Sequence, residues 1–202
     1  ERARLRRGLS PFDGVTLALA SHRHYDHFDA GYALDHLTAS PRTTFVTGND
    51  AVDDLRRLAR FEDMAAQVVE IGFEDGSRTE IDVDGIHVTA FHLRHVVDGG
   101  PNLAFLIDIE GIRILHLGDA SPFGYTAGEL VTIFGGEPLG VDVVLAPSYR
   151  WLEFESGTLL LQAAIAPRFA VPMHLVGACP FSFYDYPPVA GARLVRGGGD
   201  GG

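Results

Sequence analysis

The organising stretch of this chain is Ser21-His22-Arg23-His24-Tyr25-Asp26-His27-Phe28-Asp29, which directly follows an apolar run at residues 15–20. A short apolar run that ends in polar residues is typical of a buried strand, so we expect the cluster in the loop that leaves this strand. Alternate side chains of an extended segment share one side, so His22, His24 and Asp26 can face one cation together. His27 points elsewhere and can serve a second cation.

Imidazole and carboxylate ligands suit zinc, and they also suit manganese or iron. The competing interpretation is a polar loop or a set of hydrogen-bonded core histidines without a metal. A single histidine would favour that interpretation, but three histidines and two aspartates within nine residues favour a metal site. The chain has a single cysteine, Cys179, so the site must be built from histidine and carboxylate, and no internal disulfide is possible.

Length and composition indicate one globular domain. The chain has 202 residues, of which 46% are hydrophobic and 21% are charged. We expect one domain over residues 1–195 and a flexible glycine-rich tail over residues 196–202. The net charge of −11 disfavours a nucleic-acid partner, because phosphate binding needs clustered positive charge. No apolar run is long enough to cross a membrane and no signal peptide is visible, so we expect a cytoplasmic protein.

The apolar patterning predicts a mixture of hairpins, core strands and peripheral helices. The turns Asp84-Gly85 and Glu110-Gly111 each predict a hairpin, one over residues 78–91 and the other over residues 102–117. Further strands are predicted at residues 15–20, 44–47, 68–71, 141–146 and 169–173. Helices are predicted at residues 32–37, from Asn49 or Asp50 to about residue 60, at 125–134 and at 159–166. This mixture indicates sheets covered by helices.

Three later segments each place a ligand-type residue just past a predicted strand. His92 and His95 end one hairpin strand, Asp119 follows another strand and Gly118, and His174 follows the last strand. The glycine lets the backbone approach its neighbours closely. Strand ends that meet at one rim would bring these residues to the first cluster.

The order of these motifs resembles that of the metallo-β-lactamase fold superfamily of hydrolases, over residues 15 to about 175. Two details are similar to the branch that contains L-ascorbate-6-phosphate lactonase: Pro172-Met173-His174, and the hairpin that ends in His116-Leu117-Gly118-Asp119. The resemblance implies an α/β fold, a four-layer αββα sandwich of the metallo-β-lactamase type. Family members carry a strand pair ahead of the first motif, so we expect either that the N-terminal strands are missing from the given sequence, which we favour, or that this sheet is shorter than usual.

The resemblance also implies two divalent metal ions, with zinc favoured over manganese or iron. The first ion would be held by His22, His24 and His95. The second would be held by Asp26, His27 and His174, and Asp119 would bridge the two. His95 is preferred to His92 because it lies at the end of the strand, next to the following loop.

The implied activity is a hydrolase in which a metal-bound hydroxide cleaves a small ester, lactone or phosphoester. Asp26 would be the catalytic residue that orients the attacking water. The alternatives are an iron-dependent oxidoreductase or dioxygenase on the same fold, and a non-catalytic binding module. The expected partner is a small-molecule substrate. Arg23, Arg94 and Arg150 could bind the substrate if it is anionic, or they could be solvated surface residues.

The remaining histidines and aromatic loops have weaker assignments. We expect His116 to lie beside the ligands and His87 to be structural, and we expect His36 to be an exposed helix residue. The loops at residues 148–151 and 181–186 carry aromatic side chains that either line a pocket or pack against the core.

Overall fold

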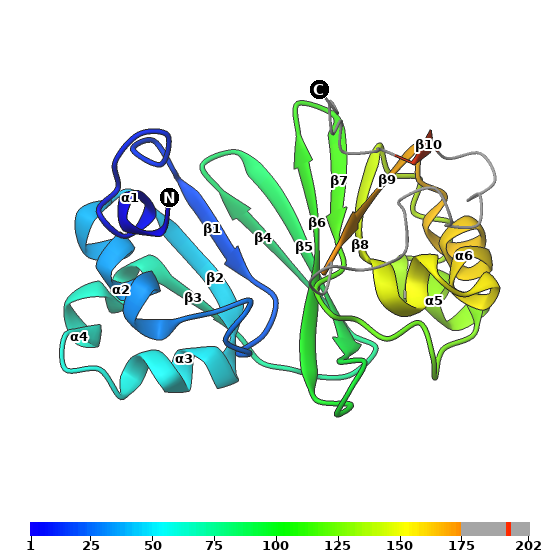
Figure 1. Cartoon of the computed structure of the whole chain (residues 1–202), viewed down its shortest axis with the longest axis horizontal. Coiled ribbons are helices and arrows are strands. Elements are labelled where there is room, and N and C mark those ends of the chain that lie inside the picture. The colour runs from blue at the N-terminus through cyan, green and yellow to red at the C-terminus, as the bar shows by residue number, and fades with distance from the viewer. Residues whose placement is uncertain (175–192, 195–202) are drawn as a thin grey trace, which may run out of the picture.

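The computed structural model describes residues 1–174 and 193–194, whose strands form two sheets that face each other. Helices from the N-terminal part of the chain cover the outer face of the smaller sheet, and later helices cover the outer face of the larger one (Figure 1). The expected four-layer αββα arrangement is therefore confirmed. The predictions for Cys179, the loop at residues 181–186 and the tail at residues 196–202 lie outside the described residues.

The smaller sheet is parallel, with the order β1-β2-β3. Parallel neighbours need crossover connections, which the intervening helices provide. Its elements are β1 (Leu17–Ala20), α2 (Ala30–Ala39), β2 (Thr44–Gly48), α3 (Asn49–Arg56), α4 (Phe61–Met64), the short turn η1 (Ala65–Gln67) and β3 (Val68–Ile71). The strand predictions are confirmed. The prediction that Asn49 or Asp50 caps a helix to residue 60 is wrong, because Gly48 occupies the cap position and α3 ends at Arg56.

The larger sheet has the order β10-β9-β8-β7-β6-β5-β4. Both predicted hairpins are present. Their turn residues Asp84, Gly85, Glu110 and Gly111 all have positive φ angles, as tight two-residue hairpin turns require. The antiparallel strands are β4 (Arg78–Val83), β5 (Ile86–Arg94), β6 (Pro101–Ile109) and β7 (Ile112–His116). The parallel part follows as β8 (Val143–Pro147), β9 (Phe169–Met173) and β10 (Arg193–Leu194).

The helices of the larger half lie near their predicted places. Helix α5 (Ala127–Phe134) begins two residues later than predicted, because Thr126 and Glu129 form a reciprocal capping box at its start. Helix α6 (Glu155–Leu160) begins earlier than predicted and continues as the helical turn η3 (Leu161–Ile165). Its end lies at Ala166, which has a positive φ angle and precedes Pro167.

The N-terminal segment contains a helix that the sequence pattern did not predict, α1 (Arg2–Arg6), which buries none of its own residues. It packs on α2, and this contact overturns the prediction that His36 is exposed. His36 is buried, with its Nδ1 atom 2.6 Å from the carbonyl oxygen of Leu5 and its Nε2 atom 3.3 Å from Oγ1 of Thr43. His36 is therefore a structural residue between α1 and α2.

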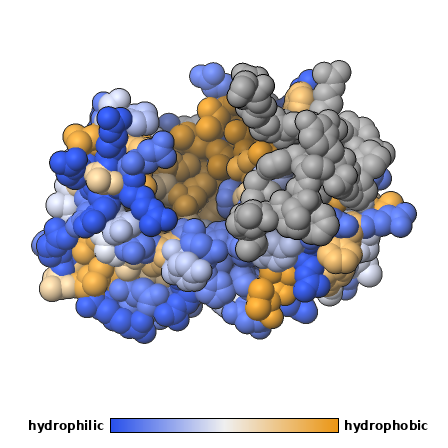
Figure 2. Space-filling model, in the orientation of Figure 1, coloured by the Kyte–Doolittle hydropathy of each residue, from blue (hydrophilic) through white to orange (hydrophobic). Residues whose placement is uncertain are grey.

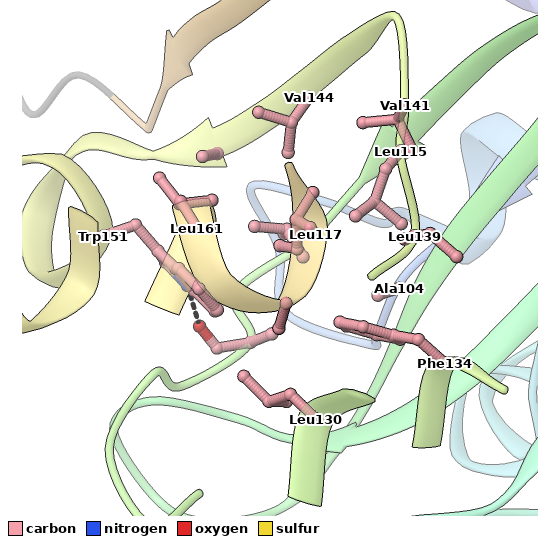
Figure 3. Close-up of a cluster of buried hydrophobic side chains, with 14 of the residues drawn as sticks. Ala104, Leu115, Leu117, Leu130, Phe134, Leu139, Val141, Val144, Trp151 and Leu161 are labelled. Atoms are coloured by element: carbon pink, nitrogen blue, oxygen red, sulfur yellow. Dashed lines mark hydrogen bonds between the residues drawn. The ribbon is translucent and has the colours of Figure 1, made fainter. Parts of the chain in front are cut away.

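Three apolar clusters separate the four layers. The cluster between the sheets draws on both of them, with Val46 from β2 and Val88 and Phe105 from β5 and β6. On one face of the molecule the hollow between the sheets has apolar walls (Figure 2). The largest cluster packs α5, α6 and η3 against the larger sheet and includes the fully buried Trp151 and Leu161 (Figure 3). No helix in the described part of the chain has the length and apolar character needed to cross a lipid bilayer.

Candidate metal centre

The histidine-rich stretch follows β1 as a series of bends and turns. The backbone N–H groups of His27 and Phe28 both donate to the carbonyl oxygen of His24, at 2.9 and 2.8 Å. The expected extended alternation is therefore wrong. The turn nevertheless brings the rings together. The His22 ring centroid lies 4.7 Å from that of His24 and 4.2 Å from that of His27.

The structure brings all seven predicted ligand residues together. Three overlapping groups each offer ligand atoms within 4.8 Å of one another: His22, His24 and His95; His22, His27 and Asp119; Asp26, His27 and His174. These residues follow β1, β5, β7 and β9, so four strand ends meet at one rim. The site therefore depends on the contact between the two sheets.

Asp119 lies at the centre of the cluster. Its Oδ1 atom is 3.3 Å from Nε2 of His27, and its Oδ2 atom is 3.3 Å from Nε2 of His174 and 3.5 Å from Nε2 of His95. The Nε2 atom of His174 is also 3.1 Å from Oδ2 of Asp26. Asp119 thus lies within reach of His95 on one side and of His27 and His174 on the other, so two cations could share its carboxylate.

His95 belongs to the cluster and His92 does not. The ring of His95 lies 4.8 Å from the ring of His22 and 4.6 Å from that of His24. His92 is turned away, where its Nδ1 atom accepts a hydrogen bond from the backbone of Glu74 and its Nε2 atom lies 3.1 Å from Oγ1 of Thr79. The cluster thus uses the histidine next to the loop.

Several buried polar atoms in the cluster point to missing partners. Within the described part of the chain, no hydrogen bond reaches Nε2 of His22, Nε2 of His95, Oδ1 of Asp119 or Nδ1 of His174. A buried polar atom without a partner costs about 1–3 kcal/mol. A divalent cation would satisfy Nε2 of His22, Nε2 of His95 and Oδ1 of Asp119, so the donor set fits zinc, manganese or iron.

The opposite edges of the rings have polar partners. Oγ of Ser21 lies 3.0 Å from Nδ1 of His22 and 3.3 Å from Nδ1 of His27, and Oδ1 of Asp98 lies 2.9 Å from Nδ1 of His95. Such partners orient a histidine ligand so that its other nitrogen faces the cation. Sequence reasoning missed Ser21 and Asp98 in these roles, although each is close in sequence to a predicted ligand.

Burial and neighbouring charges set the protonation of the site. Burial, followed by the charge of His27, lowers the pKa of His22 to about 3. Burial alone would raise the pKa of Asp119, but the nearby imidazoles of His27 and His174 outweigh it and lower that pKa to about 2. Around neutral pH the cluster therefore offers a neutral imidazole and an ionised carboxylate, which are the forms that bind metals.

The backbone around Asp119 is held closely. Gly118 has a φ angle of 57°, and a Cβ atom there would overlap Oδ1 of Asn102 and lie 2.6 Å from Cβ of Ser21. Asn102 is fully buried, and its Oδ1 atom accepts from the backbone N–H of Asp119 at 2.8 Å. The expected close approach at Gly118 is confirmed. His116 lies beside this turn, as expected, with its Nδ1 atom accepting from the backbone N–H of Gly118.

The aromatic segment after β8, Ser148–Leu152 (η2), divides its side chains between the site and the core. The Tyr149 hydroxyl donates to Oδ2 of Asp119 at 3.1 Å, whereas Trp151 is fully buried in the core.

The arginines near the rim have partners within the chain. Arg23 pairs with Asp54 and Arg94 pairs with Asp75, while the guanidinium of Arg150 lies over the ring of Phe123. His87 lies outside the cluster, 3.3 Å from Asp82.

Curated proteins with similar sequences are named as hydrolases. A UPF0173 metal-dependent hydrolase from Cupriavidus taiwanensis is 29% identical over 186 residues, which are 83% of this chain and 61% of the relative. The corresponding UPF0173 metal-dependent hydrolase from Cupriavidus necator is 28% identical over 184 residues, 82% of this chain and 60% of the relative. The chain therefore spans about three fifths of the length of the curated relatives it matches.

The family comparison and a solved structure agree with the fold. The metallo-β-lactamase fold protein YhfI from Bacillus subtilis is 13% identical, with a TM-score of 0.53 over 84% of this chain and 66% of that chain. The sequence model of the family described as Beta-lactamase superfamily domain matches residues 1–175. This match covers most of the chain, and the protein therefore belongs to the β-lactamase superfamily domain family.

Proposed function

We propose that this protein is a metal-dependent hydrolase with two divalent cations, favouring zinc, in the cluster around Asp119. His22, His24 and His95 would hold the first cation, Asp26, His27 and His174 the second, and Asp119 would contact both. The observation that carries this proposal is the convergence of seven imidazole and carboxylate side chains around buried atoms without hydrogen-bond partners in the described residues. The names of the curated relatives support the same reaction class.

The chemistry of such a site follows from its ligands. A bound divalent cation lowers the pKa of water from 15.7 to about 7 and polarises the oxygen of the bond under attack. Asp26 is the residue suited to orient the attacking water, because its carboxylate is partly exposed and lies at the edge of the cluster. Its Oδ2 atom, 3.1 Å from Nε2 of His174, would accept the proton of that water.

The substrate class we propose is a small ester, lactone or phosphoester. A lactone is favoured by the resemblance of the Pro172-Met173-His174 and Gly118-Asp119 segments to the L-ascorbate-6-phosphate lactonase branch. The net charge of −11 disfavours a nucleic acid as substrate. An anionic substrate would compete with Asp54 for Arg23 and with Asp75 for Arg94, whereas Arg150 lies over the ring of Phe123.

The test combines elemental analysis with a substrate screen. We expect two equivalents of zinc, and metal-dependent turnover of at least one of a set of lactones, thioesters, phosphodiesters and β-lactams. Asp26→Asn should weaken binding of the second cation, and at saturating Zn²⁺ it should still reduce turnover by about 10²–10⁴-fold, the range of a general base. The control His87→Ala lies outside the cluster and should retain full activity.

Three results would contradict the proposal. Purified protein without a stoichiometric metal would remove its basis. Iron as the tightly bound metal, with no hydrolysis of any substrate, would favour the oxidoreductase alternative. Full metal content with no turnover in the screen would favour a binding module.

A further inference from the structure

The turn after β8 places a phenol against the central carboxylate of the cluster. The Tyr149 hydroxyl donates to Oδ2 of Asp119 at 3.1 Å. The ring of Tyr149 meets the ring of His174 edge-on, with 5.0 Å between the centroids. Tyr149 thus contacts two of the proposed ligands, Asp119 and His174, although the three residues lie on different segments of the chain.

This turn has a strained backbone. Arg150 has a φ angle of 78° and a ψ angle of −48°, close to the γ-turn with positive φ that is rare and unfavourable for a side-chain-bearing residue. A conformation of this kind costs about 1–3 kcal/mol and persists only when surrounding contacts impose it. The strain therefore calls for contacts on both sides of Arg150 that hold it.

Trp151 provides the contact on one side. Its side chain is fully buried in the largest apolar cluster, and its Nε1 atom donates to the carbonyl oxygen of Ala120 at 2.7 Å, the dashed line of Figure 3. On the same side α6 packs closely, because a Cβ atom at Gly157 would lie 2.8 Å from Cα of Trp151. Tyr149 and Trp151 therefore bind the consecutive residues Asp119 and Ala120 across the strained residue.

The Tyr149 hydroxyl is a donor to Oδ2 of Asp119 that is not itself a proposed cation ligand. The other groups close to Oδ2 are Nε2 of His174 at 3.3 Å and Nε2 of His95 at 3.5 Å. If these nitrogens face cations, they carry no proton to donate. The phenol O–H would then be left to fix the rotation of the carboxylate, while Asn102 fixes its backbone.

We propose that Tyr149 is a positioning residue that orients the Asp119 carboxylate so that two cations can share it. This inference rests on the proposed function. Groups that hydrogen-bond to a metal ligand typically change metal affinity by about 10–100-fold when they are removed. Tyr149 would act in the same way, through Asp119, without touching a cation itself.

The test is Tyr149→Phe, which keeps the ring against His174 and removes only the hydroxyl. Metal-free protein is titrated with Zn²⁺ against a chromophoric chelator, and the thermal midpoint of the metal-free form is measured in parallel. We expect the more weakly held of the two Zn²⁺ ions to bind about 10–100-fold less tightly to Tyr149→Phe than to the wild type. The thermal midpoint of the metal-free form should change little. The control is Tyr32→Phe, which removes a phenol whose ring lies under the guanidinium of Arg6, outside the cluster, and should leave zinc affinity unchanged.

A double variant separates action through Asp119 from a general loss of structure. Asp119→Asn combined with Tyr149→Phe should bind zinc no more weakly than Asp119→Asn alone. Unchanged zinc affinity in Tyr149→Phe, with two zinc ions bound by the wild type, would overturn the role of Tyr149 and leave the proposed function standing. Additive losses in the double variant would also overturn it. A wild-type chain that binds no zinc would overturn both proposals.

Discussion

Replacing His95 or His92 by alanine tests the geometry of the site most directly, because the two residues lie three positions apart and have different surroundings. His95 lies beside His22 and His24, with its Nε2 atom buried and without a hydrogen-bond partner in the described residues. His92 is held instead by the backbone N–H of Glu74 and the hydroxyl group of Thr79. Only the first substitution should affect zinc binding.

The magnitude can be worked from general constants. Structural zinc sites with four ligands bind with about 10–16 kcal/mol, so one ligand accounts for roughly 2.5–4 kcal/mol, or about 10²–10³ in affinity. Zinc at 100 times its dissociation constant stabilises the wild type by about 2.7 kcal/mol, which raises the melting temperature by about 5–10 °C for a chain of this size. His95→Ala should reduce the first cation's increment to less than about 2 °C and leave the second cation's increment in place.

The assay is a pair of melting curves for each variant, with zinc and with a chelator. In chelator, His92→Ala should melt at a lower temperature than the wild type, because leaving the hydrogen-bond partners of His92 unsatisfied costs about 1–3 kcal/mol of folding stability. The variant should nevertheless keep the full increase in melting temperature on adding zinc. The reasoning is refuted if His95→Ala keeps the increment and His92→Ala loses it.

Three further predictions concern the surroundings of the site. Gly118→Ala should destabilise the metal-free protein by at least about 2 kcal/mol in urea unfolding, because its φ angle is 57° and the new Cβ atom would overlap Asn102; a loss below 0.5 kcal/mol, on the order of a surface substitution, would contradict this. Trp151→Phe should cost about 2–3 kcal/mol through the lost hydrogen bond and the void, and a cost near zero would speak against the anchoring role of Trp151. The metal-free protein should lose stability as the pH falls from 6.5 towards 3, because burial lowers the pKa of His22 to about 3 and only the unfolded chain takes up a proton in that range. This residue should contribute a loss of up to about 1.4 kcal/mol per pH unit. His22→Asn should show a flatter dependence of unfolding free energy on pH, and equal slopes would count against the assignment.

Local signals in the sequence were sufficient for the hairpins and for the candidate residues at strand ends, whereas the proposed ligand set came from the family resemblance. Asp84-Gly85 and Glu110-Gly111 predict their turns because only a few residues tolerate positive φ angles. The ligand-type residues at strand ends were found because strands that share a sheet edge bring their ends together. The extended alternation assumed for residues 22–26 was wrong, although the turn that replaces it also gathers the rings.

Contacts between segments distant in sequence could not be predicted. The burial of His36 depends on α1, a helix with no buried residue and hence no apolar pattern. The hydrogen bond from Tyr149 to Asp119 links two loops 30 residues apart and depends on the unusual backbone of Arg150. Such contacts follow from the packing of layers, which no short motif encodes.

The site draws its candidate ligands from both sides of the sandwich, and this division has a thermodynamic consequence. The smaller-sheet half supplies His22, His24, Asp26 and His27, and the larger-sheet half supplies the other three. Neither half alone offers the complete set, so binding of the proposed cations would be reciprocally coupled to docking of the halves. A substitution between the sheets that destabilises their docking would then weaken metal binding, and bound metal would in turn stabilise the docking.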